Sequence, residues 1–151
     1  MLAHCLLNPF TRVKGLEPIL FHCEGPFVQL PCPEALYLGL DRWAVTRNQL
    51  DIPEFRRFCQ SLIIHYADLL EMMARKGATI KVVGIAGSPS CGVLSTSRGY
   101  TGGQVHETAH SRVCGRGIFM EELVAELGRR DVVFRAEEVG QICTSRKDVG
   151  V

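Results

Sequence analysis

Three of the seven cysteines in this 151-residue chain, Cys5, Cys32 and Cys91, follow short apolar runs at points where turn residues begin. Those runs predict short parallel strands at residues 1–3, 27–30 and 80–86. In an open α/β sheet, the loops beyond the carboxyl ends of the strands meet at one edge. The three thiols are therefore expected to converge, and three thiolates suit a soft metal ion or an iron–sulfur cluster.

Composition restricts the class of protein. Hydrophobic residues make up 46% of the chain and charged residues 22%, which is enough apolar material for a single domain over residues 1–151. A formal net charge of +1 offers no basic surface for nucleic acid or for an anionic membrane. No apolar stretch has the length of a membrane span, and the start lacks the basic and apolar regions of a leader.

We therefore expect a cytoplasmic protein that acts as a monomer or a homodimer. In a reducing compartment, seven cysteines without regular spacing indicate metal binding or catalysis rather than a disulfide framework. Cys59 is interpreted as a buried small hydrophobe, because it lies on the apolar face of a predicted helix. No role is assigned to the cysteines in polar surroundings, Cys23, Cys114 and Cys143.

The strongest local pattern is a helix over residues 52–76. Asp51, with Glu54 three residues later, forms a capping-box pattern at its start, and Gly77 is typical of a helix end. The residues with helical spacing are Phe55, Phe58, Cys59, Leu62, Ile63, Tyr66, Leu69, Leu70 and Met73. Residues 80–86 are apolar throughout, which predicts a central strand buried on both faces.

The other predicted elements are shorter. They are one or two helical turns at residues 15–22, irregular chain at 35–50, a helix at 117–128 and a last strand at 132–134. The segment 87–117, rich in Gly, Ser and Thr, has a length that is usual only for functional or mobile loops. Residues 136–151 are polar and are expected to form a short helix and a frayed tail. Together these elements indicate an α/β fold, a small three-layer sandwich with a mostly parallel, Rossmann-like or flavodoxin-like sheet.

Three cysteine segments, AHCLLN at 3–8, QLPCPE at 29–34 and GSPSCG at 87–92, occur in this order. In this combination the chain resembles the thiouracil desulfidase family, small bacterial iron–sulfur proteins, and its uncharacterised relatives. The segments at 38–43 and 117–123 look like those of the same relatives. The resemblance implies a 4Fe–4S cluster held by Cys5, Cys32 and Cys91, with one iron left open. The connection between Cys5 and Cys32 is shorter than in the family, so one crossover helix is expected to be reduced.

The resemblance also implies a reaction, the hydrolytic removal of sulfur from a small thiocarbonyl compound such as a thiolated pyrimidine. Such a hydrolysis needs no net redox change, but it needs a group that activates water. Glu34 is the candidate general base, and its alternative role is to cap the next turn. Ser88 is a candidate for binding substrate or relaying a proton, and its alternative is a simple turn residue.

Further polar residues are candidates for holding the substrate. Arg42 and Ser90 are assigned to substrate binding, and Arg98 is a second arginine that could orient a uracil-like ring. The alternative for either arginine is a solvated side chain. Strand alternation directs His4 away from Cys5, so we expect His4 to pack in the core or to support a ligand.

Two other functions stay open. The chain could be an iron–sulfur or sulfur-carrier protein without turnover, which would need the cysteines but no general base. The segment HETAH at 106–110 also matches the HExxH pattern of zinc hydrolases, with His106 and His110 as ligands, Glu107 as base and Cys114 as a third ligand. Its surroundings are rich in glycine and poor in apolar residues, so a polar loop is the favoured interpretation.

Overall fold

The computed structural model describes residues 1–19, 21–100, 102 and 110–140 of the chain. The helices are α1 (Pro33–Leu38), α2 (Arg47–Leu50), α3 (Pro53–Arg75) and α4 (Ile118–Arg129), with two 3-10 helices, η1 (His4–Leu6) and η2 (Pro9–Thr11). The strands are β1 (Ile80–Ile85), β2 (Ser95–Arg98), β3 (Ser111–Cys114) and β4 (Phe134–Val139). None of the described helices is both long and apolar enough to cross a membrane.

Parallel pairing organises the centre of the fold. β1 pairs with β4 in parallel, from Ile80 opposite Phe134 to Ile85 opposite Val139. On the other side of β1, Leu2 forms parallel bridges to both Val83 and Gln29. The predicted α/β fold with a parallel sheet is therefore confirmed, and β1 is a central strand as expected.

The predicted strands at 1–3 and 27–30 are reduced to single bridges. The first segment has no room to extend, because the chain turns into η1 directly after Ala3. The second is followed by Pro31, which lacks the N–H that a longer ladder would need. Backbone bonds still hold both segments in place, with the N–H of Leu30 donating to Leu2 O at 2.8 Å and the N–H of Ala3 donating to Val83 O at 3.0 Å.

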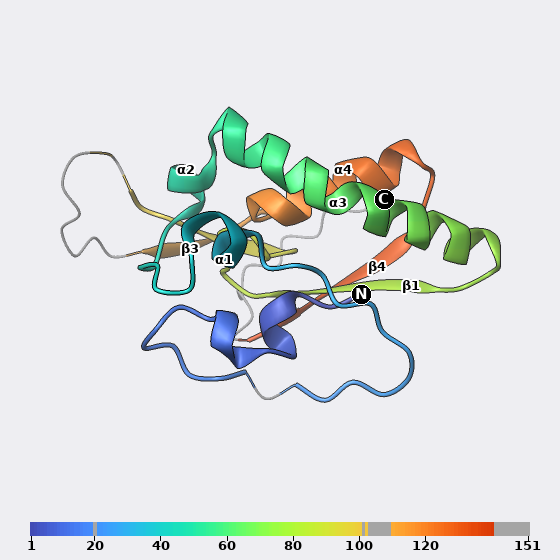
Figure 1. The fold of residues 1–151 in the computed structure, drawn as a ribbon, viewed down its shortest axis with the longest axis horizontal. Coiled ribbons are helices and arrows are strands. Elements are labelled where there is room, and N and C mark those ends of the chain that lie inside the picture. Colours follow the sequence, from blue (N-terminus) through green and yellow to red (C-terminus); the bar gives the residue numbers. More distant parts are fainter. Residues whose placement is uncertain (20, 101, 103–109, 141–151) are drawn as a thin grey trace.

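The two long helices lie together on one side of the sheet. In Figure 1, α3 and α4 run above β1 and β4, whereas η1 and η2 lie below these strands. The predicted helices at 52–76 and 117–128 are confirmed. The apolar face of α3 is buried through Phe55, Cys59, Ile63, Ala67 and Leu70, and that of α4 through Ile118, Phe119, Met120, Leu123 and Leu127.

The predicted capping box at the start of α3 is wrong. Ile52 is the N-terminal cap residue, and Pro53 occupies the first helical turn. The carboxylate of Asp51 instead accepts a hydrogen bond from Arg56 at 2.7 Å and one from Arg47 at 2.9 Å. The charged guanidinium groups compete successfully for Asp51 because a charge-assisted bond is stronger than a bond to a backbone amide.

Four other boundaries also differ from expectation. Residues 15–19 and 21–22 contain no helical turns, and residues 35–50 are not irregular, because α1 and α2 cover parts of them. Within the expected loop 87–117, β2 and β3 form an antiparallel pair, with Ser95 opposite Cys114. The last strand covers Phe134–Val139 rather than 132–134, so residues 136–139 are strand and not the expected helix. The rest of the predicted tail, from residue 141, lies outside the described residues.

Glycines allow the loop that carries Cys91 to lie directly against β1 and α4. A Cβ atom at Gly84, inside β1, would lie 2.3 Å from the carbonyl oxygen of Cys91 and 2.4 Å from Cγ2 of Val93. A Cβ atom at Gly117, which caps α4, would lie 2.5 Å from the carbonyl carbon of Ser90. Only residues without a side chain permit this approach.

The first prediction concerns this close packing. Gly84→Ala should lower the free energy of unfolding by about 1–3 kcal/mol, because the new methyl group overpacks a filled site. Gly128→Ala is the matched control, since a Cβ atom there meets nothing within 4 Å in an exposed part of α4. That control should gain up to about 1 kcal/mol from helix propensity. Urea unfolding of both variants tests this, and equal stability of Gly84→Ala and wild type would contradict it.

Candidate functional site

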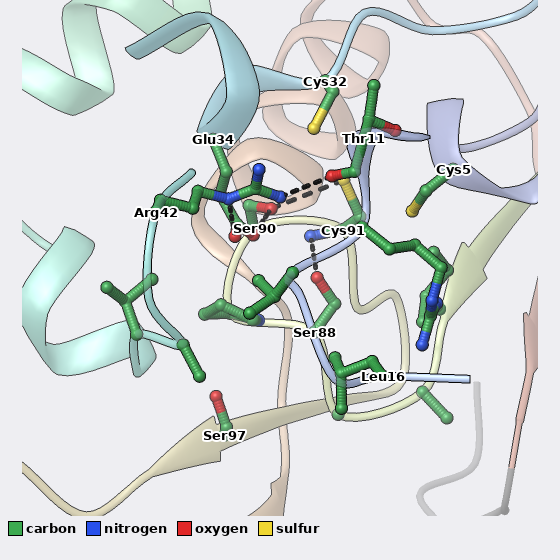
Figure 2. A pocket seen from close by; sticks show the side chains of 18 of the residues that line it. Cys5, Thr11, Leu16, Cys32, Glu34, Arg42, Ser88, Ser90, Cys91 and Ser97 are labelled. Atoms are coloured by element: carbon green, nitrogen blue, oxygen red, sulfur yellow. Dashed lines mark hydrogen bonds and ion pairs between the residues drawn. The ribbon is translucent and has the colours of Figure 1, made fainter. Parts of the chain in front are cut away.

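One pocket of about 390 Å³ contains the residues that the sequence singled out (Figure 2). Its lining includes every residue to which a site role was assigned: Cys5, Cys32, Glu34, Arg42, Ser88, Ser90 and Cys91. Arg98, the second arginine considered for the substrate, is exposed on β2 and is not part of this lining. The structure thus brings together three distant segments of the chain around one pocket.

Each cysteine is held by local backbone structure. Cys5 lies in η1, and Cys32 caps α1, its sulfur accepting a hydrogen bond from the N–H of Ala35 at 3.4 Å. Cys91 lies in the turn after β1, where its carbonyl accepts the N–H of Ile85 at 3.0 Å. Its own N–H donates to the hydroxyl of Ser88 at 3.0 Å. Ser88 therefore shapes the turn that presents Cys91, as its alternative role predicts, while its side chain also lines the pocket.

His4 supports the arrangement from outside this pocket. Its Nδ1 lies 2.9 Å from the carbonyl oxygen of Leu30, and its own carbonyl accepts a hydrogen bond from Gln29 at 3.1 Å. These bonds tie the segment of Cys5 to the segment that leads into Cys32. His4 thus supports the neighbouring ligand candidates, as strand alternation indicated.

Burial raises the pKa of all three thiols. For Cys5 the pKa rises to about 11, first through burial and then through the charge of Cys32. The pKa of Cys91, 4% exposed, lies well above its ordinary value through burial and then through the charges of Cys32 and Cys5. Burial is also the main reason why the pKa of Cys32 is raised. The three thiols are close enough to influence one another, and they are protonated near neutral pH when no metal is bound.

A buried ion pair forms the wall beside the thiols. Nε of Arg42 lies 3.2 Å from Oε2 of Glu34, and the two residues are only 7% and 6% exposed. Arg42 also donates to the carbonyl of Thr11 at 2.7 Å, and to the carbonyl of Gly39 at 3.3 Å. Figure 2 shows the guanidinium of Arg42 between Glu34 and Thr11. The pair links η2, α1 and the chain after α1.

Ser90 connects this ion pair to a thiol. Its hydroxyl donates to Oε1 of Glu34, and its oxygen lies 3.5 Å from the sulfur of Cys91. Glu34 does not cap α1, because Cys32 is the N-terminal cap residue of this helix. Arg42 is not a solvated arginine either, since its side chain is buried and paired. The carboxylate of Glu34 belongs to the pocket wall.

Sequence reasoning missed three residues that the structure associates with the pocket and its loops. Arg12 and Ser97 line the pocket, and neither Nε of Arg12 nor Oγ of Ser97, both buried, has a hydrogen-bond partner among the described residues. Glu138, in the segment expected to be a polar tail, accepts the N–H groups of residues 93, 94 and 95 at 2.7, 2.6 and 2.8 Å. It anchors the chain that follows Cys91. Nothing in local sequence marks these three residues, because only the tertiary fold brings them here.

Two of the remaining cysteines, Cys59 and Cys114, lie away from the pocket lining, and Cys143 lies outside the described residues. Cys59 is fully buried in the core, and burial raises the pKa of its thiol to about 12, which confirms its interpretation as an inert hydrophobe. Cys114, the third ligand of the zinc alternative, lies in β3, so residues 111–114 do not continue a helix beyond His110. His110 is exposed and lines the pocket, whereas His106 and Glu107 lie outside the described residues. Across the described ranges, no three His, Cys, Asp or Glu side chains are arranged to hold a single metal ion.

The second prediction concerns the buried ion pair. Arg42→Gln should lower the free energy of unfolding by about 3–5 kcal/mol, because it leaves the carboxylate of Glu34 buried without its charged partner. Arg98→Gln, on the exposed part of β2, is the control and should change stability by less than about 0.5 kcal/mol. Adding Glu34→Gln to Arg42→Gln should restore part of the loss. Urea unfolding of wild type, Arg42→Gln, Glu34→Gln and the double variant forms the cycle, and additive losses would contradict the prediction.

Comparisons with known proteins give one relative and no family. The chain is 27% identical over 148 residues to an uncharacterized protein of Methanocaldococcus jannaschii, an alignment that covers 91% of this chain and 83% of that protein. No protein-family model matches the chain. No solved structure matches it either. The chain thus has an archaeal relative along most of its length, and its function has to be argued from its own residues.

Proposed function

We propose that this protein is a hydrolytic desulfidase that removes sulfur from a small thiocarbonyl compound, using a 4Fe–4S cluster bound by Cys5, Cys32 and Cys91. The observation that carries the proposal is the meeting of three thiols and one buried carboxylate on a single pocket. Soft thiolates are the usual ligands of iron–sulfur clusters. A hydrolase needs a group such as a carboxylate beside the ligands to activate water, whereas a carrier protein does not need such a group.

The donor set fits such a cluster. The cysteines of the described residues are free thiols, and three of them line the pocket. A cluster of four irons spaces its ligands more widely than a single ion does, so the lack of a single-ion arrangement among the described residues does not oppose it. Glu34 and Arg42, which also line the pocket, are already paired with each other and need not serve as ligands.

When bound, a cluster with three cysteine ligands supplies a Lewis-acidic iron that prefers sulfur over oxygen. The overall reaction is balanced by water alone. The oxygen of water forms a bond to the thiocarbonyl carbon, the carbon–sulfur bond breaks, and both protons of water end on the departing sulfide. The oxidation state of the carbon does not change, so no reductant or oxidant is consumed.

The chain's own contribution is to activate water and to exclude bulk solvent. Glu34 is the general base in this proposal, because its carboxylate lines the pocket and both of its oxygens are held, one by Arg42 and one by Ser90. Arg42 donates one hydrogen bond to the carboxylate and is itself held by its bonds to the carbonyls of Gly39 and Thr11, which fixes the carboxylate in position. Ser90 lies between Glu34 and Cys91, where its hydroxyl can pass a proton between the pocket and the carboxylate.

The third prediction tests the ligands. After anaerobic reconstitution with iron and sulfide, Cys5→Ser, Cys32→Ser and Cys91→Ser should each fail to hold the cluster, because a hydroxyl is a poorer ligand for this site than a thiolate. Cys59→Ser should load fully and lose about 1–3 kcal/mol of stability through its buried hydroxyl. Iron and sulfide per chain are measured. Loss of iron from Cys59→Ser together with full loading of Cys5→Ser would overturn the ligand assignment.

The fourth prediction tests the base. Glu34→Gln keeps the size of the side chain, so the variant should load the cluster and release sulfide from 2-thiouracil about 100- to 10,000-fold more slowly than wild type. Glu137→Gln, a half-exposed glutamate of β4 paired with Lys81, is the matched control and should keep the wild-type rate. Iron content is measured beside the rate. Unchanged sulfide release by Glu34→Gln would remove Glu34 from the mechanism.

The same preparation separates the proposal from a carrier protein. A desulfidase releases sulfide and the oxygenated product in equal amounts over many turnovers. A loaded wild-type protein that releases no sulfide from any thiocarbonyl compound offered would contradict the desulfidase function and favour the carrier.

A further inference from the structure

Beyond the ion pair of Glu34 and Arg42, the pocket is lined by another arginine, Arg12, which has no carboxylate partner among the described residues. Three arginines and one glutamate line it, namely Arg12, Arg42, Arg112 and Glu34. Arg42 is compensated by Glu34 and donates to two backbone carbonyls besides. The guanidinium of Arg12, by contrast, has no hydrogen bond or ion pair with any residue in the described part of the chain.

The side chain of Arg12 is partly shielded from solvent. Arg12 is half-buried, and its Nε is shielded from solvent without an acceptor among the described residues. A guanidinium on an open surface keeps water on all its N–H groups, but one with a shielded N–H has lost water there and gained nothing in exchange. A negatively charged acceptor satisfies such a group best, and the two oxygens of a carboxylate match its fork of donors.

Ser97 adds a second, neutral contact on another part of the wall. Its hydroxyl oxygen is buried and has no partner in the described residues. In Figure 2 this hydroxyl points toward the pocket from β2, across from Cys32 and Glu34. A ligand that fills the space between the thiols and β2 thus meets a polar group at the end far from Cys32.

We propose that the substrate of this pocket carries a carboxylate besides its thiocarbonyl group, and that Arg12 binds this carboxylate while Ser97 contacts another part of the ligand. This inference rests on the proposed function for the thiocarbonyl group only. A neutral thiolated pyrimidine offers Arg12 only a carbonyl oxygen, whereas a thiolated heterocyclic acid offers it a charged pair of oxygens. Arg12 is a specificity residue here, and Glu34 keeps its role at the reacting carbon.

The test uses probes that differ only in the carboxylate and contain no sulfur to release. Binding of uracil and of uracil-6-carboxylate to the full chain, with and without cluster, is measured by calorimetry at low salt. Wild type should bind the carboxylate probe at least about tenfold more tightly, about 1.4 kcal/mol, and added salt should reduce the difference. Arg12→Gln should bind both probes equally, and Arg12→Lys should recover part of the preference.

Arg98→Gln is the control, since this arginine lies outside the pocket, and it should keep the wild-type preference. Thermal unfolding of each variant shows whether it is folded before binding is compared. Equal binding of the two probes by wild type, or an unchanged preference in Arg12→Gln, would overturn the inference. An Arg12→Gln variant that only loses iron would also overturn it, because Arg12 would then serve Cys5, whose pKa its charge lowers.

The inference and the proposed function can fail separately. A carboxylate preference without sulfide release from 2-thiouracil or its 6-carboxylate would leave the anion site standing and remove the desulfidase. Sulfide release at equal kcat/KM from both thio-compounds would support the desulfidase and remove the carboxylate site.

Discussion

The buried ion pair of Glu34 and Arg42 is the constraint on which the pocket depends. Two charges that are 6% and 7% exposed have lost nearly all of their water, and such a loss is tolerated only when hydrogen bonds replace it. Here the replacement comes from three different segments, through Thr11, Gly39 and Ser90. Since each of these segments adjoins a cysteine loop or lies between two of them, satisfying the charges also fixes the thiols. The geometry of the ligand candidates therefore follows from the need to compensate a buried carboxylate.

The same burial sets the chemistry of the thiols. Away from water each thiol holds its proton, with a pKa of about 11 for Cys5, and the three negative charges would oppose one another if all were ionised without a cation. Binding of a metal centre must therefore displace protons, which couples its affinity to pH. The pocket becomes a strong ligand set only in the presence of a cation that stabilises all three thiolates.

Local pattern was sufficient for the elements with strong periodicity. The apolar spacing from Phe55 to Met73 predicted α3 within one residue at each end, and the run of residues 80–86, apolar except for Lys81, predicted β1, because both elements bury most of one face or more. The cysteines were found because strand ends of a parallel sheet meet at one edge. Asp51 was misassigned because local capping rules do not include Arg56, a partner from the next turn of chain. Glu138 and Arg12 were missed because their roles exist only after distant segments have packed.

In the proposed mechanism, Glu34 is both a buried charge that must be compensated and the general base, so stability and catalysis depend on the same carboxylate. A general base must be desolvated enough to react but must keep an oxygen that can take a proton. Arg42 occupies one oxygen of Glu34 fully, and Ser90 occupies the other through a hydroxyl that both donates and accepts. A backbone N–H or a second arginine at the place of Ser90 would stabilise the carboxylate equally well, but it could not accept a proton in return. Of the two partners that the carboxylate has among the described residues, the hydroxyl is thus the one that leaves it connected to the pocket, and it contacts Cys91 as well.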